Sequence, residues 1–279
     1  MSLSLALLLP FLGKLATTAA LTVAISRVAE RTGPFLASVL ITLPIFAGPS
    51  FFFLMFEQSP DFIARGALYA FAGAGPVLAF TAGYIQASRG ASLAGCLLAG
   101  ALAWFAVALP MRLLPFDLTI AVLWALLGAA IAFAFRRRFD LHARPTAPPA
   151  RWAHLLGRAG IAGLAVATVA TVGGLLGPET TGLVVSFPLT MTASVWLLYR
   201  QYGGEFAAAT LASTQRTLPS YASFCLALAL LAEALPVQTA FWCALGVSVV
   251  SATVLALLGR RARRRLSPPA PGYPPTADR

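Results

Sequence analysis

"GPFLASVLITLPIFAGPSFFFL", from Gly33 to Leu54, and "GPETTGLVVSFPLTMTASVWLL", from Gly177 to Leu198, are two versions of one apolar segment. Each begins with Gly-Pro and carries a proline eleven residues after its first glycine, and the copies lie 144 residues apart without a gap. A proline inside an apolar helix removes one backbone hydrogen bond and bends or breaks the helix. The sequence therefore predicts two matched, interrupted helices, at Pro44 and Pro188.

The composition is typical of an integral membrane protein. Of the 279 residues, 59% are hydrophobic and only 10% are charged, whereas soluble domains carry about 25% charged residues. Apolar runs near the length that crosses a bilayer recur along the chain. We therefore predict an all-α, polytopic transmembrane helical bundle with about nine spans. The expected spans are residues 6–28, 34–56, 62–86, 91–110, 115–135, 156–176, 179–200, 206–230 and 236–258.

The net charge of +11 comes mainly from arginines at the ends of apolar runs. This placement favours a lipid bilayer rather than nucleic acid as the partner, because such arginines reach toward lipid phosphates. One side collects most of them, including the cluster at residues 136–138 and Arg200. The other side is expected to hold Lys14, Arg65, Arg112, Glu57, Asp61, Asp117, Glu179, Glu205 and Glu233. The positive-inside rule then predicts an N-terminus outside the cytoplasm and a cytoplasmic C-terminus.

The offset of 144 residues extends beyond the two opening segments, since Lys14 falls on Arg158 and Phe62 falls on Phe206. The chain therefore reads as a duplication with four spans in each copy. Five spans separate the two starts, so the copies are expected to have opposite orientations, as in the inverted-topology repeats of many transporters. The expected organisation is a first repeat (1–110), a linking helix with a basic, Pro-rich loop (111–154), a second repeat (155–258) and a basic, Pro-rich tail (259–279).

Each half resembles the small four-helix bacterial membrane proteins of the GlpM type. In that family a lysine opens a helix of small residues, a basic-Thr turn follows, and the second helix contains a proline. The matching residues here are Lys14, Ala19, Ala20, Arg31, Thr32, Ala37, Ser38, Leu43 and Pro44. The second copy departs from this pattern, because Arg158 replaces the lysine and Leu176-Gly177 replaces the Arg-Thr turn. The resemblance implies a fused, inverted pair of such units and names no substrate. It also implies a bacterial inner-membrane protein, in which the outer N-terminus is periplasmic and the C-terminus is cytoplasmic.

Matched interruptions in two inverted halves indicate a binding site near the membrane midplane. Thr42 and Ser186 each precede the proline by two residues and supply hydroxyl groups there. The alternative is a structural kink in which each hydroxyl bonds to its own helix. Arg216, beside Gln215 in the eighth expected span, is a charge inside an apolar segment. Such a charge needs carbonyl groups, water or an anionic ligand, unless the span is shifted and places the arginine at an interface.

Lys14 and Arg158 are expected near opposite membrane faces, where they either gate two entrances or extend toward lipid headgroups; we favour the second reading. The sequence predicts no metal and no cofactor, because its three cysteines are dispersed in apolar segments. It contains no nucleotide-binding or hydrolase motif, so an enzyme is not expected. The candidate substrate-binding residues are Lys14, Thr42, Pro44, Arg158, Ser186, Pro188, Gln215 and Arg216.

The function that these features favour is a secondary transporter or exporter of a small polar or anionic solute. The main alternative is a non-transporting membrane scaffold or an accessory subunit of an envelope complex. A lipid-handling flippase is a third reading, and it would need a cleft open to the bilayer. The sequence leaves the oligomeric state open, including a homo-oligomer.

Overall fold

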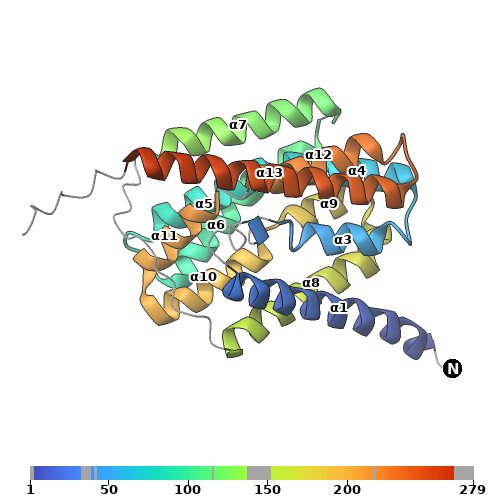
Figure 1. Cartoon of the computed structure of the whole chain (residues 1–279), viewed down its shortest axis with the longest axis horizontal. Coiled ribbons are helices and arrows are strands. Elements are labelled where there is room, and N and C mark those ends of the chain that lie inside the picture. Colours follow the sequence, from blue (N-terminus) through green and yellow to red (C-terminus); the bar gives the residue numbers. More distant parts are fainter. Residues whose placement is uncertain are drawn as a thin grey trace, which may run out of the picture.

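A computed structural model describes residues 3–32, 39–40, 43–114, 116–136, 152–215 and 218–266. Every regular element in this part of the chain is helical, which confirms the all-α prediction (Figure 1). The first half contains α1 (Leu3–Arg31), α3 (Ala47–Leu54), α4 (Pro60–Ala72), α5 (Ala74–Ala87), α6 (Leu93–Ala108), the 3₁₀ turn η1 (Leu109–Arg112) and α7 (Leu118–Arg136). The second half contains α8 (Trp152–Leu176), α9 (Pro178–Ser186), α10 (Leu189–Tyr202), α11 (Gly204–Thr214), α12 (Leu218–Leu231) and α13 (Val237–Leu266).

Six helical segments in the described residues are long and apolar enough to cross a membrane. They are Leu8–Ala29, Pro60–Ala87, Leu93–Arg112, Leu155–Leu176, Pro178–Tyr202 and Val237–Gly259. These segments correspond to six of the predicted spans, and they support a multi-pass membrane protein. The fifth predicted span appears as a shorter apolar helix, Leu118–Ile131. The second and eighth predicted spans include residues outside the described part of the chain, so the count of nine is not confirmed.

Pro188 interrupts the seventh span as the sequence predicts. Helix α9 ends at Ser186 and α10 begins at Leu189, and between them Phe187 is extended, with φ −62° and ψ 129°. Pro188 has φ −78° and ψ 53°, close to an inverse γ-turn. The Leu189 N–H donates to the Phe187 carbonyl oxygen at 2.8 Å across this turn. The break is therefore a compact turn rather than a smooth bend.

The same turn surrounds Pro44 in the first half. The Ile45 N–H donates to the Leu43 carbonyl oxygen at 2.8 Å, and the Gly48 N–H donates to the Pro44 carbonyl oxygen at 2.8 Å. The second bond has its counterpart in the second half, where the Thr192 N–H donates to the Pro188 carbonyl oxygen at 2.8 Å. Helix α3 then begins at Ala47. Two prolines related by sequence thus have the same local backbone hydrogen bonds.

Helices α1 and α8 pack against each other in antiparallel directions (Figure 1). Near one end the Lys14 ammonium donates to the Ala170 carbonyl oxygen, and near the other the Arg27 guanidinium lies 3.3 Å from the ring centroid of Trp152. Between these contacts, a Cβ atom at Gly163 would lie 2.6 Å from the Leu15 carbonyl oxygen. Glycine is needed there because the two backbones approach closely, as is common between helices in lipid.

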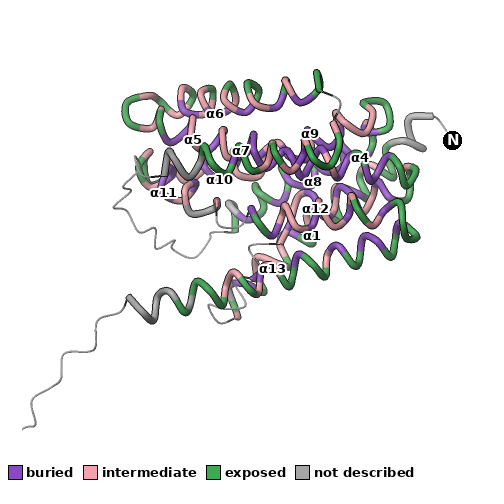
Figure 2. Tube along the Cα trace, turned by 90° about the horizontal axis from the view of Figure 1, so that it is seen from above, coloured by how far each residue is buried: buried purple, intermediate pink, exposed green. Residues whose placement is uncertain are grey.

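The remaining helices form a bundle around a core shared by both halves. Hairpins α5–α6 and α12–α13 flank it, while α4 packs against both α9 and α12 and α5 packs against both α7 and α11. The ring of Phe224 in the core contacts Phe51 of α3, with centroids 6.4 Å apart, and Phe241 of α13, with centroids 5.8 Å apart. Exposed residues recur along α6 and α13, and many of them are large apolar side chains (Figure 2). These surfaces suit contact with lipid.

The α1–α8 packing predicts a specific substitution effect. Because a Cβ atom at Gly163 would lie 2.6 Å from the Leu15 carbonyl oxygen, a side chain at this position forces the two helices apart. We expect Gly163→Ala to lower the free energy of unfolding by about 1–3 kcal/mol. Thermal unfolding of the purified protein in detergent measures this effect.

The matched control for this substitution is Gly160→Ala. Gly160 lies on the same helix, but it is exposed and a Cβ atom there would meet nothing within 4 Å. The packing predicts no loss of stability for this variant. Equal unfolding midpoints for Gly163→Ala and Gly160→Ala would contradict the packing.

Candidate functional site

The break between α9 and α10 contacts a kink between α4 and α5. Gly73 separates α4 from α5, and Pro76 lacks the N–H that would otherwise bond to the Ala72 carbonyl oxygen. The Ser186 side chain occupies the space where a Cβ atom of Gly73 would lie. Ser186 itself is buried, and its hydroxyl donates to the Leu183 carbonyl oxygen at 2.7 Å. Its bonding therefore follows the structural alternative, in which the hydroxyl satisfies its own helix.

Helix α12 of the second half also reaches this kink. The Tyr221 hydroxyl donates to the Ala70 carbonyl oxygen at 2.9 Å, one turn before Gly73. Ser220, the preceding residue, points elsewhere, since its hydroxyl lies 2.9 Å from the Ser248 hydroxyl on α13. We call Gly73, Ser186, Phe187, Pro188 and Tyr221 the central kink region.

Aromatic rings close one side of the central kink region. The Phe187 ring packs edge-on against Trp104, with centroids 5.0 Å apart, and against Phe80, with centroids 6.3 Å apart. Trp104 is 5% exposed, and its indole N–H has no hydrogen-bond partner among the described residues. A buried donor without a partner is uncommon in folded proteins. This N–H can therefore donate to a polar ligand without first losing a protein contact.

Lys14 is buried and forms an ion pair, and our expectation that it extends toward lipid headgroups is wrong. The residue is 7% exposed, and its Nζ lies 2.6 Å from Glu57 Oε1 and 3.2 Å from the Ala170 carbonyl oxygen. The pairing has a physical reason, because an ammonium group inside a membrane helix is costly unless an anion and further hydrogen bonds satisfy it. Sequence reasoning placed both residues on one side but did not pair them.

More charged residues gather at this end of the bundle, which we call the Lys14 end. Arg65 Nε lies 3.2 Å from Asp61 Oδ1, and a terminal nitrogen of Arg65 lies 3.8 Å from Glu179 Oε1. Arg112 donates to the Thr180 hydroxyl at 2.6 Å. Both contacts to α9 join the two halves. A hollow of about 540 Å³ opens here, lined by Arg65, Leu68, Tyr69, Phe116, Asp117, Ile120 and Glu179.

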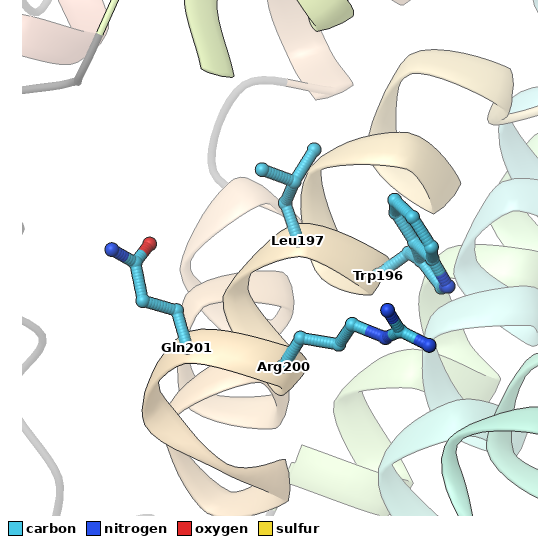
Figure 3. Close-up of a pocket in the computed structure, with 4 residues that line it drawn as sticks. All are labelled: Trp196, Leu197, Arg200 and Gln201. Atoms are coloured by element: carbon cyan, nitrogen blue, oxygen red, sulfur yellow. The ribbon is translucent and has the colours of Figure 1, made fainter. Parts of the chain in front are cut away.

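The opposite end, which we call the Arg200 end, differs from the sequence prediction in one respect. Glu205 was expected on the side of Lys14. However, α10 ends at Tyr202 and α11 begins at Gly204, so Glu205 follows the same turn as Arg200 and shares its side. A hollow of about 300 Å³ lies beside this turn, lined by Trp196, Leu197, Arg200 and Gln201 (Figure 3).

Of the predicted site residues, the structure places Ser186 and Pro188 in the central kink region. Pro44 and Pro188 are buried at their turns, Gln215 is half-buried, and Arg158 is exposed on α8. Thr42 and Arg216 lie outside the described residues. Sequence reasoning missed Glu57 as the partner of Lys14 and Gly73 as the contact of Ser186. The second had a signal in the sequence, since Gly73 belongs to the helix-breaking run Gly73-Ala-Gly-Pro76.

Within the described chain, no group of His, Cys, Asp and Glu residues is arranged to hold a metal ion. No protein family, curated protein or solved structure matches this chain.

The contact at Gly73 predicts a strong substitution effect. Gly73→Ala should lower the free energy of unfolding by about 1–3 kcal/mol, because the new methyl group would overlap Ser186 in a packed interior. Adding Ser186→Gly should restore part of this loss by removing the overlapping atoms. Thermal unfolding of the purified protein in detergent measures both effects.

Gly246→Ala is the matched control for that substitution. Gly246 lies inside α13, and a Cβ atom there would meet nothing within 4 Å. Alanine should therefore leave the unfolding midpoint unchanged or raise it, since alanine favours helix more than glycine does. A Gly73→Ala protein that is as stable as Gly246→Ala would contradict the packing at the kink.

Proposed function

We propose that this chain is a secondary transporter or exporter of a small polar or anionic solute, built from two inverted repeats. The observation that carries the proposal is the matched pair of proline turns, at Pro44 and Pro188, in two halves whose first helices run antiparallel. Interrupted helices at corresponding positions of inverted halves are typical of midplane substrate sites in transporters.

We call two residues that lie 144 positions apart in the sequence "mates", and contacts between such mates support the inverted repeat. Ala19 and Gly163 differ by the offset of 144 residues, and they face each other where α1 and α8 cross. A twofold axis that exchanges two helices brings equivalent residues together where it passes between them. Mates also share local bonds: the Ser50 hydroxyl donates to the Phe46 carbonyl oxygen, and the Ser194 hydroxyl donates to the Thr190 carbonyl oxygen.

The helix pairing supports the repeat as well. Under the offset of 144 residues, α4 and α5 correspond to α11 and α12, and α6 corresponds to α13. The contact of α4 with α12 then has its counterpart in the contact of α5 with α11. Likewise the α5–α6 hairpin corresponds to α12–α13, and the contact of α3 with α13 corresponds to that of α10 with α6. Helix α7 packs beside the first half and has no counterpart.

The arrangement of the broken helices suits an anionic or polar solute. In Figure 1, α3 and α10 run from the middle of the molecule toward opposite ends. Their N-terminal ends, which carry partial positive charge, therefore begin near the middle of its length. Cationic side chains occur toward both ends, with Lys14 in one half and its mate Arg158 in the other. Arg216 remains the proposed anion contact along the path.

One observation favours the alternative of a non-transporting scaffold or accessory subunit. Ser186 is buried and bonded to its own helix, and the two hollows described above lie at the two ends of the bundle. Under the transport proposal this is a closed state, and a water-filled path to the kink opens in another state. The proposed setting is the bacterial inner membrane, with the Lys14 end periplasmic and the Arg200 end cytoplasmic. We propose no enzymatic activity, and the GlpM-like origin of each half is part of the same proposal.

Cysteine accessibility separates the two functions. We expect a small membrane-impermeant thiol reagent to label S186C slowly in intact cells, because labelling has to wait for the opening of the kink. T42C and R216C should also react from the aqueous phase. The background lacks Cys96, Cys225 and Cys243, and the rate of labelling is followed by mass spectrometry.

The controls are D61C, at an exposed position in the first turn of α4, and a protein that keeps only Cys225, which is buried in the core. Transport through this kink would be refuted if S186C were labelled as slowly as the buried Cys225 and if T42C and R216C did not react. The scaffold function would then be the better account.

A further inference from the structure

The Lys14–Glu57 ion pair joins a buried cation to an anion that reaches water. The Lys14 side chain is 9% exposed, whereas the Glu57 side chain is 41% exposed. Lys14 projects from the interior of a membrane-spanning helix, while Glu57 lies in the turn that follows α3. The ammonium is therefore fixed in the protein, and the carboxylate is held by a short segment at the surface of the bundle.

The surroundings of the ammonium leave it dependent on one negative charge. An ammonium has three N–H donors, and those of Lys14 have Glu57 and the Ala170 carbonyl oxygen as partners among the described residues. The carbonyl oxygen is neutral, so Glu57 supplies the compensating charge. If Glu57 moves away, a buried ammonium is left uncompensated, which is strongly unfavourable unless another anion takes its place. Glu57 itself loses less, because its exposed carboxylate can be hydrated.

We propose that Lys14 is an exchangeable anion site for small carboxylates, and that Glu57 is its built-in occupant. A free carboxylate that displaces Glu57 reproduces the same charge-assisted hydrogen bond to the ammonium. This inference rests on the proposed transport of a polar or anionic solute and gives that solute a class, a small carboxylate. It also assigns a role to Glu57, whose carboxylate competes with the bound solute for the Lys14 ammonium and so releases the solute.

The sequence mates of this pair differ in the way the proposal requires. The offset of 144 residues places Arg158 on Lys14 and Gln201 on Glu57. The second half thus keeps the cation but replaces the carboxylate with a neutral amide. Gln201 lines the hollow beside Arg200, where the guanidinium carbon of Arg200 lies 5.1 Å from the ring centroid of Trp196 (Figure 3). At the positions equivalent to Lys14 and Glu57, the second half therefore offers a solute a cation and an amide in place of a cation and a competing carboxylate.

The test is chemical rescue of Glu57→Ala in the full-length protein purified in detergent. This substitution removes a CH₂–COO⁻ group, which acetate replaces. Glu57→Ala should lower the midpoint of thermal unfolding, and sodium acetate should raise it by about 3 °C relative to sodium chloride at equal ionic strength. Wild type should show a smaller acetate effect, because Glu57 already occupies the site.

Two variants provide the controls. K14Q/E57A removes the ammonium as well, and it should lose the difference between acetate and chloride. Asp61→Ala removes an exposed carboxylate that pairs with Arg65 at the same end of the bundle, and it should show no acetate-specific gain. If Glu57→Ala does not fold, Glu57→Gln is measured in its place, with the same expected sign.

An acetate effect in Glu57→Ala that disappears in K14Q/E57A supports the anion site. Equal midpoints in acetate and chloride, or the same acetate gain in K14Q/E57A, would overturn it. The assay measures binding and involves no flux, so its result is independent of the thiol-labelling experiment. A protein that shows rescue but has an inaccessible kink keeps the anion site and loses the proposed transport.

Discussion

Backbone hydrogen bonding inside a membrane is the constraint on which the rest of this structure depends. A proline in an apolar helix leaves polar groups without partners, and lipid cannot satisfy them. The chain meets this constraint locally, through the turn that joins the Leu189 N–H to the Phe187 carbonyl oxygen and through the Ser186 hydroxyl. The compact turn also places Phe187 among the aromatic rings of Phe80 and Trp104. The break is thus a defined structural element.

Close contacts at glycines then hold neighbouring helices together. Gly73 admits Ser186, Gly163 lies against the backbone of α1, and a Cβ atom at Gly182 would overlap the backbone of Gly66. Because lipid is as apolar as the helices, such small-residue contacts are a main source of helix association in membranes. Glycines therefore fix where the two halves meet. Any movement of one half against the other would have to break or rearrange these contacts.

The sequence predicted the helical class, six of the spans and the proline breaks, because hydropathy and the missing proline N–H act within a single helix. It could not predict contacts that depend on which helices become neighbours. Lys14 is an example: a lysine near a helix end can extend to the interface or pair inside the protein. The choice depends on Glu57 and Ala170, which are distant in sequence. The Ser186–Gly73 contact was hidden for the same reason.

Opposite orientation of the two halves is the central claim, and labelling of two mates tests it most directly. Asp61 and Glu205 differ by the offset of 144 residues, and both are exposed in the first turn of α4 and α11, respectively. Single cysteines at these positions, in a background without native cysteines, are treated in intact cells with a membrane-impermeant thiol reagent. The account predicts that D61C reacts from outside, whereas E205C reacts only after the cells are opened. Reaction of both cysteines from the same side would contradict it.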